Sequence, residues 1–132
     1  MPIAVVWDNE EKTVVRFDVH GIWTAEDADI SRLLMFKFCD SVIHRVDAIW
    51  YWVDSESRTR VPMGAMRVLT AMQRSPHPRR GKIVTVPRRY DMVGRIWLDV
   101  ISKALPHLRA QIMGADTLEE ARVLLKGLRE KV

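Results

Sequence analysis

The residues Val46–Val53 form the segment that most constrains how this chain can fold. Ile49–Val53 is a continuous apolar and aromatic run that contains Trp50, Tyr51 and Trp52 in succession. Such a run is typical of a strand that is covered on both faces, because successive side chains of a strand point to opposite faces of the sheet. We therefore expect Val46–Val53 to be an interior strand of a sheet that carries helices.

The rest of the chain alternates between strand patterns and helix patterns. The further strand patterns cover Ile3–Trp7, Thr13–Val19, Ile83–Val86 and Leu108–Met113, and the helix patterns begin near Thr24, Pro62, Tyr90 and Thr117. The resulting order is β-β-α-β-α-β-α-β-α. A hairpin followed by repeated strand–helix units predicts an α/β fold with a five-stranded, mostly parallel mixed sheet and four helices. Residues 1–132 contain no linker-like segment, so we expect one domain.

Two of the predicted helices begin with a capping signal. Thr24 is a favourable N-cap residue, and Glu26 and Asp27 follow it, where a helix favours negative charge. Thr117 is followed three residues later by Glu120, which is the pattern of a capping box. We expect helices to begin directly after both threonines.

The sequence also indicates the setting of the protein. Cys39 is the one cysteine, so an internal disulfide is excluded, and its apolar surroundings indicate a buried, unreactive thiol. No apolar run reaches the about 20 residues that cross a membrane. The first residues have a strand pattern and not that of a signal peptide. We expect a cytoplasmic protein of bacterial type that is not transmembrane.

Four short motifs, spread over nearly the whole chain, occur in the order found in one known family. They are Gly21-Ile22-Trp23-Thr24, His44-Arg45-Val46-Asp47, His77-Pro78-Arg79-Arg80-Gly81 and Thr117-Leu118-Glu119-Glu120-Ala121. With these motifs the chain resembles the STAS family, the domains of sulfate transporters and anti-sigma-factor antagonists. It is most similar to uncharacterised bacterial STAS-like proteins, which are sometimes grouped with lipid-transfer domains of the CRAL-TRIO type. The resemblance implies the STAS fold and a regulatory or ligand-sensing role.

The phosphorylation switch of the antagonists does not carry over to this chain. Those proteins have Asp-Ser-Ser/Thr-Gly at the start of the second helix, and the serine or threonine is phosphorylated. Aligning that glycine with Gly64 places Val61-Pro62-Met63 at the preceding positions, where no hydroxyl is available. Ser55 and Ser57 lie earlier, in the loop, so we expect no phosphorylation at the second helix.

The sequence contains no residue set with the spacing of a familiar catalytic or metal site. Cys39 lies within a helix pattern, Ser55 is not part of a Gly-x-Ser-x-Gly elbow, and the four histidines are scattered. There is no cysteine pair, no His-x-x-x-His pattern and no glycine-rich phosphate loop. We expect no catalytic residue, no metal ion and no cofactor, with a small enzyme of unknown chemistry as an alternative.

The aromatic strand allows two interpretations. Trp50 and Trp52 fill a core, as side chains at such spacing commonly do. Alternatively, they form the wall of a ligand pocket together with Met63 and Met66 of the adjoining predicted helix. Tryptophan has a polar edge that seeks a partner when buried, and methionine adapts to irregular spaces, so both residue types suit a pocket.

Basic residues are concentrated in the middle of the chain. Residues 58–98 hold ten basic residues and one acidic residue, whereas residues 1–57 hold five basic and eleven acidic residues. Arg79, Arg80 and Lys82 precede a predicted strand and so belong to the amino edge of the sheet. The arginines that follow strands, with two nearby hydroxyl residues, belong to the carboxyl edge: Arg58, Arg60, Arg88, Arg89, Ser55 and Tyr90. Arginine binds carboxylate and phosphate bidentately, so we expect an anion site there, and a solvated basic face is the alternative.

These features favour a non-enzymatic regulatory or ligand-binding module. The partner expected at the carboxyl edge of the sheet is an anionic small molecule, a lipid headgroup or an acidic protein. A nucleic-acid-binding protein is the runner-up, because the net charge of +4 attracts phosphates. No aromatic interleaving or familiar nucleic-acid motif supports that alternative. The sequence leaves the oligomeric state open, a homodimer included.

Overall fold

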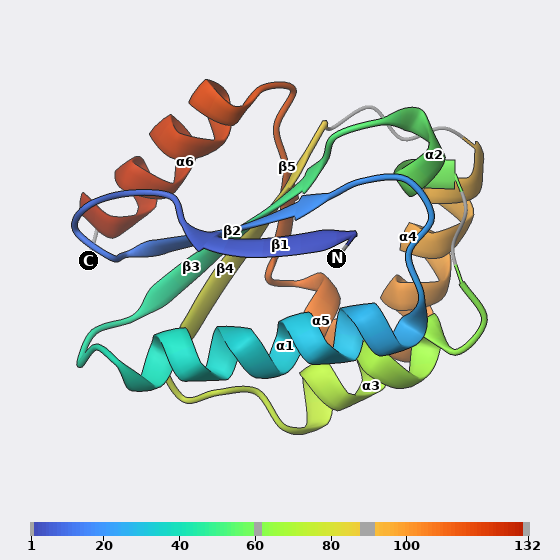
Figure 1. The fold of residues 1–132 in the computed structure, drawn as a ribbon, viewed down its shortest axis with the longest axis horizontal. Coiled ribbons are helices and arrows are strands. Elements are labelled where there is room, and N and C mark those ends of the chain that lie inside the picture. The colour runs from blue at the N-terminus through green and yellow to red at the C-terminus, as the bar shows by residue number, and fades with distance from the viewer. Residues whose placement is uncertain (1, 60–61, 88–91, 131–132) are drawn as a thin grey trace.

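The computed structural model describes residues 2–59, 62–87 and 92–130. Its strands are β1 (Ile3–Trp7), β2 (Val14–Val19), β3 (Val46–Trp52), β4 (Arg80–Val86) and β5 (Ile112–Gly114). Its helices are α1 (Ala25–Asp40), α2 (Ser55–Thr59), α3 (Ala65–Arg74), α4 (Met92–Ala104), α5 (Pro106–Arg109) and α6 (Leu118–Glu130), as Figure 1 shows. The expected α/β fold with a five-stranded mixed sheet is confirmed. The short helices α2 and α5 come in addition to the four predicted ones.

The strands lie in the sheet in the order in which they occur in the chain. β1 pairs with β2 antiparallel, and the other three pairings are parallel. β3 is therefore the middle strand, and the prediction that Val46–Val53 is an interior strand is confirmed. Val46, Ala48 and Ile49 are almost completely buried, as the apolar pattern requires.

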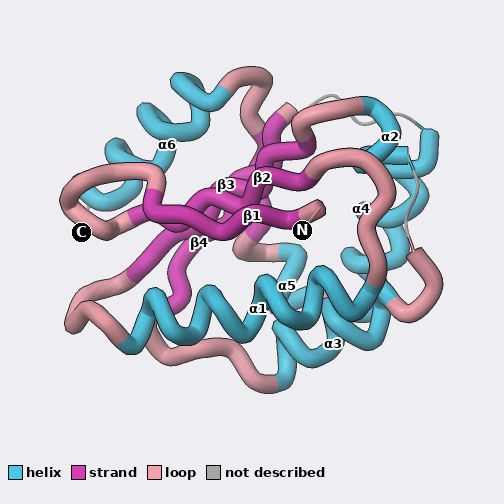
Figure 2. The backbone as a smooth tube through the Cα atoms, in the orientation of Figure 1, coloured by secondary structure: helices cyan, strands magenta, loops and turns pink. Residues whose placement is uncertain are grey.

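The connections between the parallel strands cover one face of the sheet. Because strand order follows chain order from β2 to β5, successive crossovers of the usual right-handed sense place α1, α3, α4 and α5 on the same side. Met35, Val68, Ile101 and Leu108 of these four helices accordingly share one core cluster. On the other face, α6 buries Leu125 in a separate, smaller cluster. Figures 1 and 2 show the sheet between these two layers.

The side chains of β3 alternate between these two clusters. Trp50 and Trp52 pack on the face that carries α1 and α3, whereas Ile49 and Tyr51 pack on the face that carries α6. Two neighbouring tryptophans therefore stand on the same face, two residues apart, as the period of a strand requires. This arrangement determines where a pocket can form.

Both capping signals are present, with one difference. Thr24 accepts a hydrogen bond from the Asp27 N–H at 3.0 Å, and the Asp27 carboxylate accepts one from the Thr24 N–H at 2.9 Å, so the box is complete. Thr117 accepts from the Glu120 N–H at 3.1 Å. The Glu120 carboxylate, however, accepts from the N–H of Asp116 and not from that of Thr117. The N-cap predictions are confirmed, and the second box is displaced by one residue.

The predicted strand over Leu108–Met113 is wrong in its first half. Pro106 occupies the first turn of α5, where its fixed φ and missing N–H are compatible with a helix. Leu108 therefore belongs to α5, and its side chain is 1% exposed in the core. The strand β5 is confined to Ile112–Gly114, because the short helix uses the residues that the apolar pattern assigns to a longer strand.

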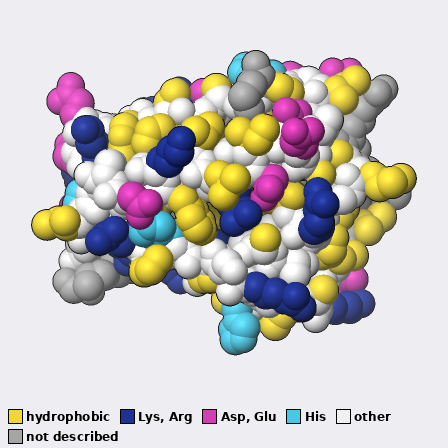
Figure 3. Space-filling view, turned by 60° about the horizontal axis from the view of Figure 1, so that its bottom comes forward, with side chains coloured by type: hydrophobic (Ala, Val, Ile, Leu, Met, Phe, Trp, Pro, Cys, Tyr) yellow, Lys and Arg dark blue, Asp and Glu magenta, His cyan; other side chains and the backbone are white. Residues whose placement is uncertain are grey.

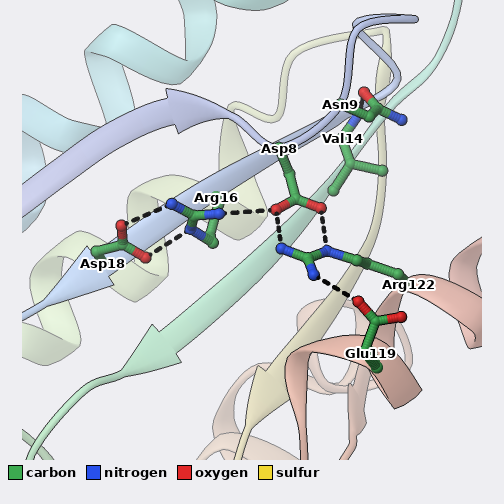
Figure 4. A network of polar contacts seen from close by, with 7 residues as sticks. All are labelled: Asp8, Asn9, Val14, Arg16, Asp18, Glu119 and Arg122. Atoms are coloured by element: carbon green, nitrogen blue, oxygen red, sulfur yellow. Dashed lines mark hydrogen bonds and ion pairs between the residues drawn. The ribbon is translucent and has the colours of Figure 1, made fainter.

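Helix α6 is anchored to the β1–β2 hairpin by an ionic network, shown in Figure 4. Arg122 of α6 donates two hydrogen bonds of 2.9 Å to the carboxylate of Asp8, whose side chain is 1% exposed. Arg16 donates a further bond of 2.9 Å to the same carboxylate. Burial acts to raise the pKa of Asp8, but the bonds from Arg122 and Arg16 outweigh it and lower that pKa. The two ends of the chain are thus joined through one buried carboxylate.

Within the part of the chain that the structure describes, no helix has both the length and the apolar character needed to cross a membrane.

Candidate ligand-binding cavity

A cavity of about 190 Å³ lies between the sheet and the helices of the α1 face. The sheet contributes Trp52, Ile83 and Ile112 from its three neighbouring strands, and Val68 of α3 and Ile101 of α4 lie among the opposing residues. The lining is apolar except for a few side chains, namely Ser57, Arg58 and Thr85. Such a lining favours apolar matter over water, because water would find few hydrogen-bond partners there.

Four of the five tryptophans of the chain line the cavity. The ring centroids of Trp50 and Trp52 are 5.8 Å apart with 30° between the ring planes, and Trp23 lies 5.6 Å from Trp52 at 45°. Trp97 of α4 completes the set. Phe17 stacks on Trp50 at 4.7 Å and so supports this wall from the side. Rings held in contact with one another form a stiff aromatic surface on which another flat or apolar group can pack.

Small residues leave room opposite the tryptophans. Ala28 of α1 and Ala65 of α3 line the cavity where longer side chains would fill it. The two helices approach closely at their starts, since a Cβ atom on Gly64 would lie 3.3 Å from the Cβ of Ala25. Gly64 also has a φ of 88°, which glycine adopts without strain. The helices meet at this point, and the alanines keep the space behind it open.

Helix α2 is fixed beside the cavity by the carboxylate of Asp54. This group accepts hydrogen bonds from the Ser57 N–H at 2.8 Å and from the Gly21 N–H at 2.8 and 3.1 Å. The N–H groups of Ser57 and then of Gly21 lower the pKa of Asp54, because they stabilise its charged form. Trp23 adds a third link, since its indole Nε1–H donates to the Ser57 carbonyl at 2.8 Å. Helix α2 is therefore held against the loop that precedes α1.

Arg58 of α2 is the one charged side chain among the described lining residues. It is half-buried, and within the described part of the chain it forms no ion pair and no hydrogen bond. Glu56, two residues before it, is exposed and forms no ion pair with it in the described part of the chain, and the carboxylate of Asp54 is occupied by backbone N–H groups. A guanidinium that has no partner among the described residues thus borders an apolar cavity at the carboxyl edge of the sheet.

The four pocket-lining predictions divide into two groups. Trp50 and Trp52 line the cavity. Met66 packs against the core cluster but is not part of the lining. Met63 is 98% exposed, so its assignment to the pocket wall is wrong. The reason is that α3 begins at Ala65 and not near Pro62, so Met63 precedes the helix and is not part of its apolar stripe.

Most of the predicted anion site falls outside the described residues. Arg60, Arg88, Arg89 and Tyr90 lie there, so their gathering at the carboxyl edge stays a prediction. Ser55 opens α2, but its side chain is likewise outside the description. Arg58 is the member of the set that the structure places, and it lies at the expected edge.

Both arginines at the amino edge, Arg79 and Arg80, have protein partners. Arg80 donates to the Met72 carbonyl at 2.9 Å and to the Gln111 side chain at 3.2 Å, and Arg79 donates to the Cys39 carbonyl at 3.4 Å. Figure 3, turned toward the α1 and α3 side, shows Lys and Arg dispersed among Asp, Glu and apolar side chains. The visible face therefore lacks the uniform positive stripe typical of nucleic-acid-binding surfaces.

Sequence reasoning missed Trp23, Trp97 and Leu69 as lining residues. Trp97 and Leu69 lie on apolar helical stripes, and Trp23 follows the hairpin directly. Those patterns predict burial, but they do not distinguish a filled core from a cavity wall. The useful signal is the high tryptophan count, because rings of this size rarely pack without leaving irregular spaces.

The geometry suits binding more readily than covalent chemistry. Burial, followed by the nearby charge of Asp40, raises the pKa of Cys39 to about 11, so this thiol is not a thiolate at neutral pH. Among the described residues, no three His, Cys, Asp or Glu side chains are grouped in a way that would hold a metal ion. His77 contacts Asp40 at 2.6 Å, but neither residue is part of the cavity lining.

Comparison with protein-family models, with curated proteins and with solved structures finds no match to this chain.

Proposed function

We propose that this protein is a non-enzymatic ligand-binding module that takes a small apolar molecule into the tryptophan-lined cavity. The observation that carries the proposal is an apolar space of about 190 Å³ with four tryptophans in its lining. An engineered apolar cavity of about 150 Å³ in another protein binds benzene. The cavity described here therefore suits one aromatic ring with a short substituent, or a short acyl chain, and is small for a drug-sized ligand.

A regulatory role for this binding is part of the proposal. It rests on the resemblance of the four ordered motifs to the STAS family, whose fold we propose for this chain. The mixed sheet with a leading antiparallel hairpin is compatible with that fold. Since Val61-Pro62-Met63 offers no acceptor hydroxyl, the signal would come from occupancy of the cavity and not from phosphorylation of the second helix.

The proposal is tested with 3-phenylpropanol, a neutral probe of one ring and a short chain. We expect a saturable change in tryptophan fluorescence, because the rings that border the cavity would exchange water for the probe. Native mass spectrometry is expected to show one probe molecule per chain. If neither signal appears at millimolar concentrations of the probe, the cavity does not bind ligands of this class and the proposal is wrong.

A pair of alanine variants makes this test specific for the cavity. Ala65→Leu adds three carbon atoms to the lining and should weaken probe binding by filling the space. Ala104→Leu adds the same atoms at an exposed position of α4 and should leave binding unchanged. Equal effects of the two substitutions would mean that the probe binds elsewhere.

A further inference from the structure

We infer that the ligand of the cavity is a monocarboxylate whose apolar part packs on the tryptophans and whose carboxylate pairs with Arg58. This inference rests on the proposed function and names the chemical class of the ligand. It comes from a contrast within one site: the lining is apolar, yet it includes one guanidinium.

The first step is that Arg58 has unused hydrogen-bonding capacity. A guanidinium carries five N–H donors. Within the described residues, none of those of Arg58 is used by a carboxylate or a carbonyl. Arg80, at the opposite edge of the sheet, directs Nη1 to the Met72 carbonyl and Nη2 to the Gln111 side chain. Arg58 therefore differs from Arg80 in lacking a partner among the residues that the structure describes.

The second step is that the surroundings strengthen any ion pair that Arg58 forms. Arg58 shares the cavity lining with Trp23 and Trp52, and Trp23 donates its indole N–H to the carbonyl of the preceding residue, Ser57, so the guanidinium borders a largely apolar space. Charge-assisted hydrogen bonds are about twice as strong as neutral ones and gain further where the local dielectric constant is low. A ligand with an apolar body and an anionic group can pack its body in the cavity and pair its charge with Arg58.

The third step concerns the charge of the ligand. A single guanidinium balances one negative charge, and its planar fork matches the two oxygens of a carboxylate. A ligand with a cationic group would meet Arg58 as a like charge at the same place. The described lining holds no carboxylate that would compensate a cation. The site therefore selects a small aromatic or short aliphatic acid over its neutral and cationic relatives.

The experiment compares three probes with the same apolar body: 3-phenylpropionate, 3-phenylpropanol and 3-phenylpropylamine. Affinities are measured at pH 7 by tryptophan fluorescence and by calorimetry, at one ionic strength. We expect the carboxylate to bind about tenfold or more tightly than the alcohol, as one charge-assisted hydrogen bond provides. The amine is expected to bind most weakly of the three.

Arg58→Gln should reduce the preference for the carboxylate over the alcohol to less than about threefold, because the charge is lost while the apolar lining remains. The readout is the ratio of the two affinities in the same variant, and circular dichroism and thermal unfolding show separately that the variant is folded. Arg67→Gln removes the same charge from an exposed position of α3 and is the matched control. It should preserve the full preference for the carboxylate.

The outcomes separate this inference from the proposed function. If the alcohol binds but the carboxylate binds no better, or if Arg58→Gln leaves the preference intact, the carboxylate inference is wrong and the binding function stands. If the amine binds best, the site selects cations and the inference is likewise wrong. If none of the three probes binds, both the inference and the proposed function are wrong.

Discussion

Trp52 belongs to the cavity wall and not to the filled core, and its truncation should reveal the difference. Phe17, on the neighbouring strand, is 2% exposed, so Phe17→Ala should cost about 3–5 kcal/mol of unfolding free energy. Trp52 is half-buried and borders open space. Trp52→Ala should therefore cost less than about 3 kcal/mol.

Urea-induced unfolding of the two variants measures these free energies in parallel. A loss from Trp52→Ala as large as that from Phe17→Ala would mean that the ring is a core residue. The cavity would then be a packing defect, and the ligand-facing role of β3 would be lost.

Asp54 provides a pH-dependent contact next to the cavity. Its pKa lies below its ordinary value of 3.8, because the N–H groups of Ser57 and Gly21 bind the carboxylate. A lowered pKa in the folded state stabilises the protein above pH about 3.8, and this contribution disappears as the pH falls through the folded value. Acid should therefore loosen the contact between α2 and the loop before α1.

The Asp54→Ala variant isolates this effect from that of Asp8, whose pKa is also lowered. Wild type should be more stable than Asp54→Ala at pH 6, and the difference should shrink as the pH falls below about 4. Chemical unfolding at a series of pH values measures it. Since 3-phenylpropanol does not titrate, weaker binding of this probe at low pH would show that the loosened contact of α2 also affects the cavity. A difference in stability that does not change with pH would exclude the ionised carboxylate as its source.

The attachment of α6 depends on one buried carboxylate. Asp8 receives hydrogen bonds from Arg122 and Arg16, and its removal leaves these guanidinium groups only their outer partners, Glu119 and Asp18. Breaking a buried ion pair costs about 3–5 kcal/mol. Both arginines keep partial access to solvent, so we expect Asp8→Ala to cost about 3 kcal/mol, at the lower end of that range.

The matched control for this prediction is Asp99→Ala. Asp99 pairs with Lys103 on the surface of α4 with both side chains largely exposed, so its loss should cost less than about 1 kcal/mol. Thermal unfolding of both variants under the same conditions provides the comparison. Similar losses from the two substitutions would show that the network around Asp8 contributes no more than a surface pair.

The elements of this fold could be predicted wherever the local pattern and the tertiary packing agree. The run around Trp50 predicts an interior strand, and Thr24 predicts the start of α1, because burial and capping are properties of short segments. The pattern fails at Leu108, where an apolar residue suits a buried helix turn as well as a strand. It also fails at Met63, since α3 begins only after Gly64, whose φ of 88° is not helical.

The candidate site could be predicted only in part, for a different reason. Trp50 and Arg58 stand out in the sequence by residue type and by their position near the end of a strand. The cavity itself arises because Ala28 and Ala65 meet the tryptophans across elements that are far apart in the chain. Alternation and periodicity describe which side chains are buried, but not whether the space between them is filled.

The uneven covering of the sheet divides the molecule into two regions. On one face, the crossover helices form a large cluster that contains the cavity. On the other face, α6 buries Ala121 and Leu125 and contributes no residue to the cavity lining. The two regions share the sheet but use opposite sides of its strands. A ligand should therefore raise the free energy of local opening in the first region. In the second region it should raise only the free energy of global unfolding.

Hydrogen exchange of the backbone amides tests this division. With 3-phenylpropanol at about 100 times its dissociation constant, openings that destroy the cavity become about 2.7 kcal/mol more costly. Amides of α3 and β3 that exchange through such openings should slow by about 100-fold. Amides of α6 that exchange when this helix detaches should keep their rates, because the cavity persists in that open state. If α6 slows as much as α3 does, the helix does not open independently, and the sheet with both of its layers unfolds as one unit.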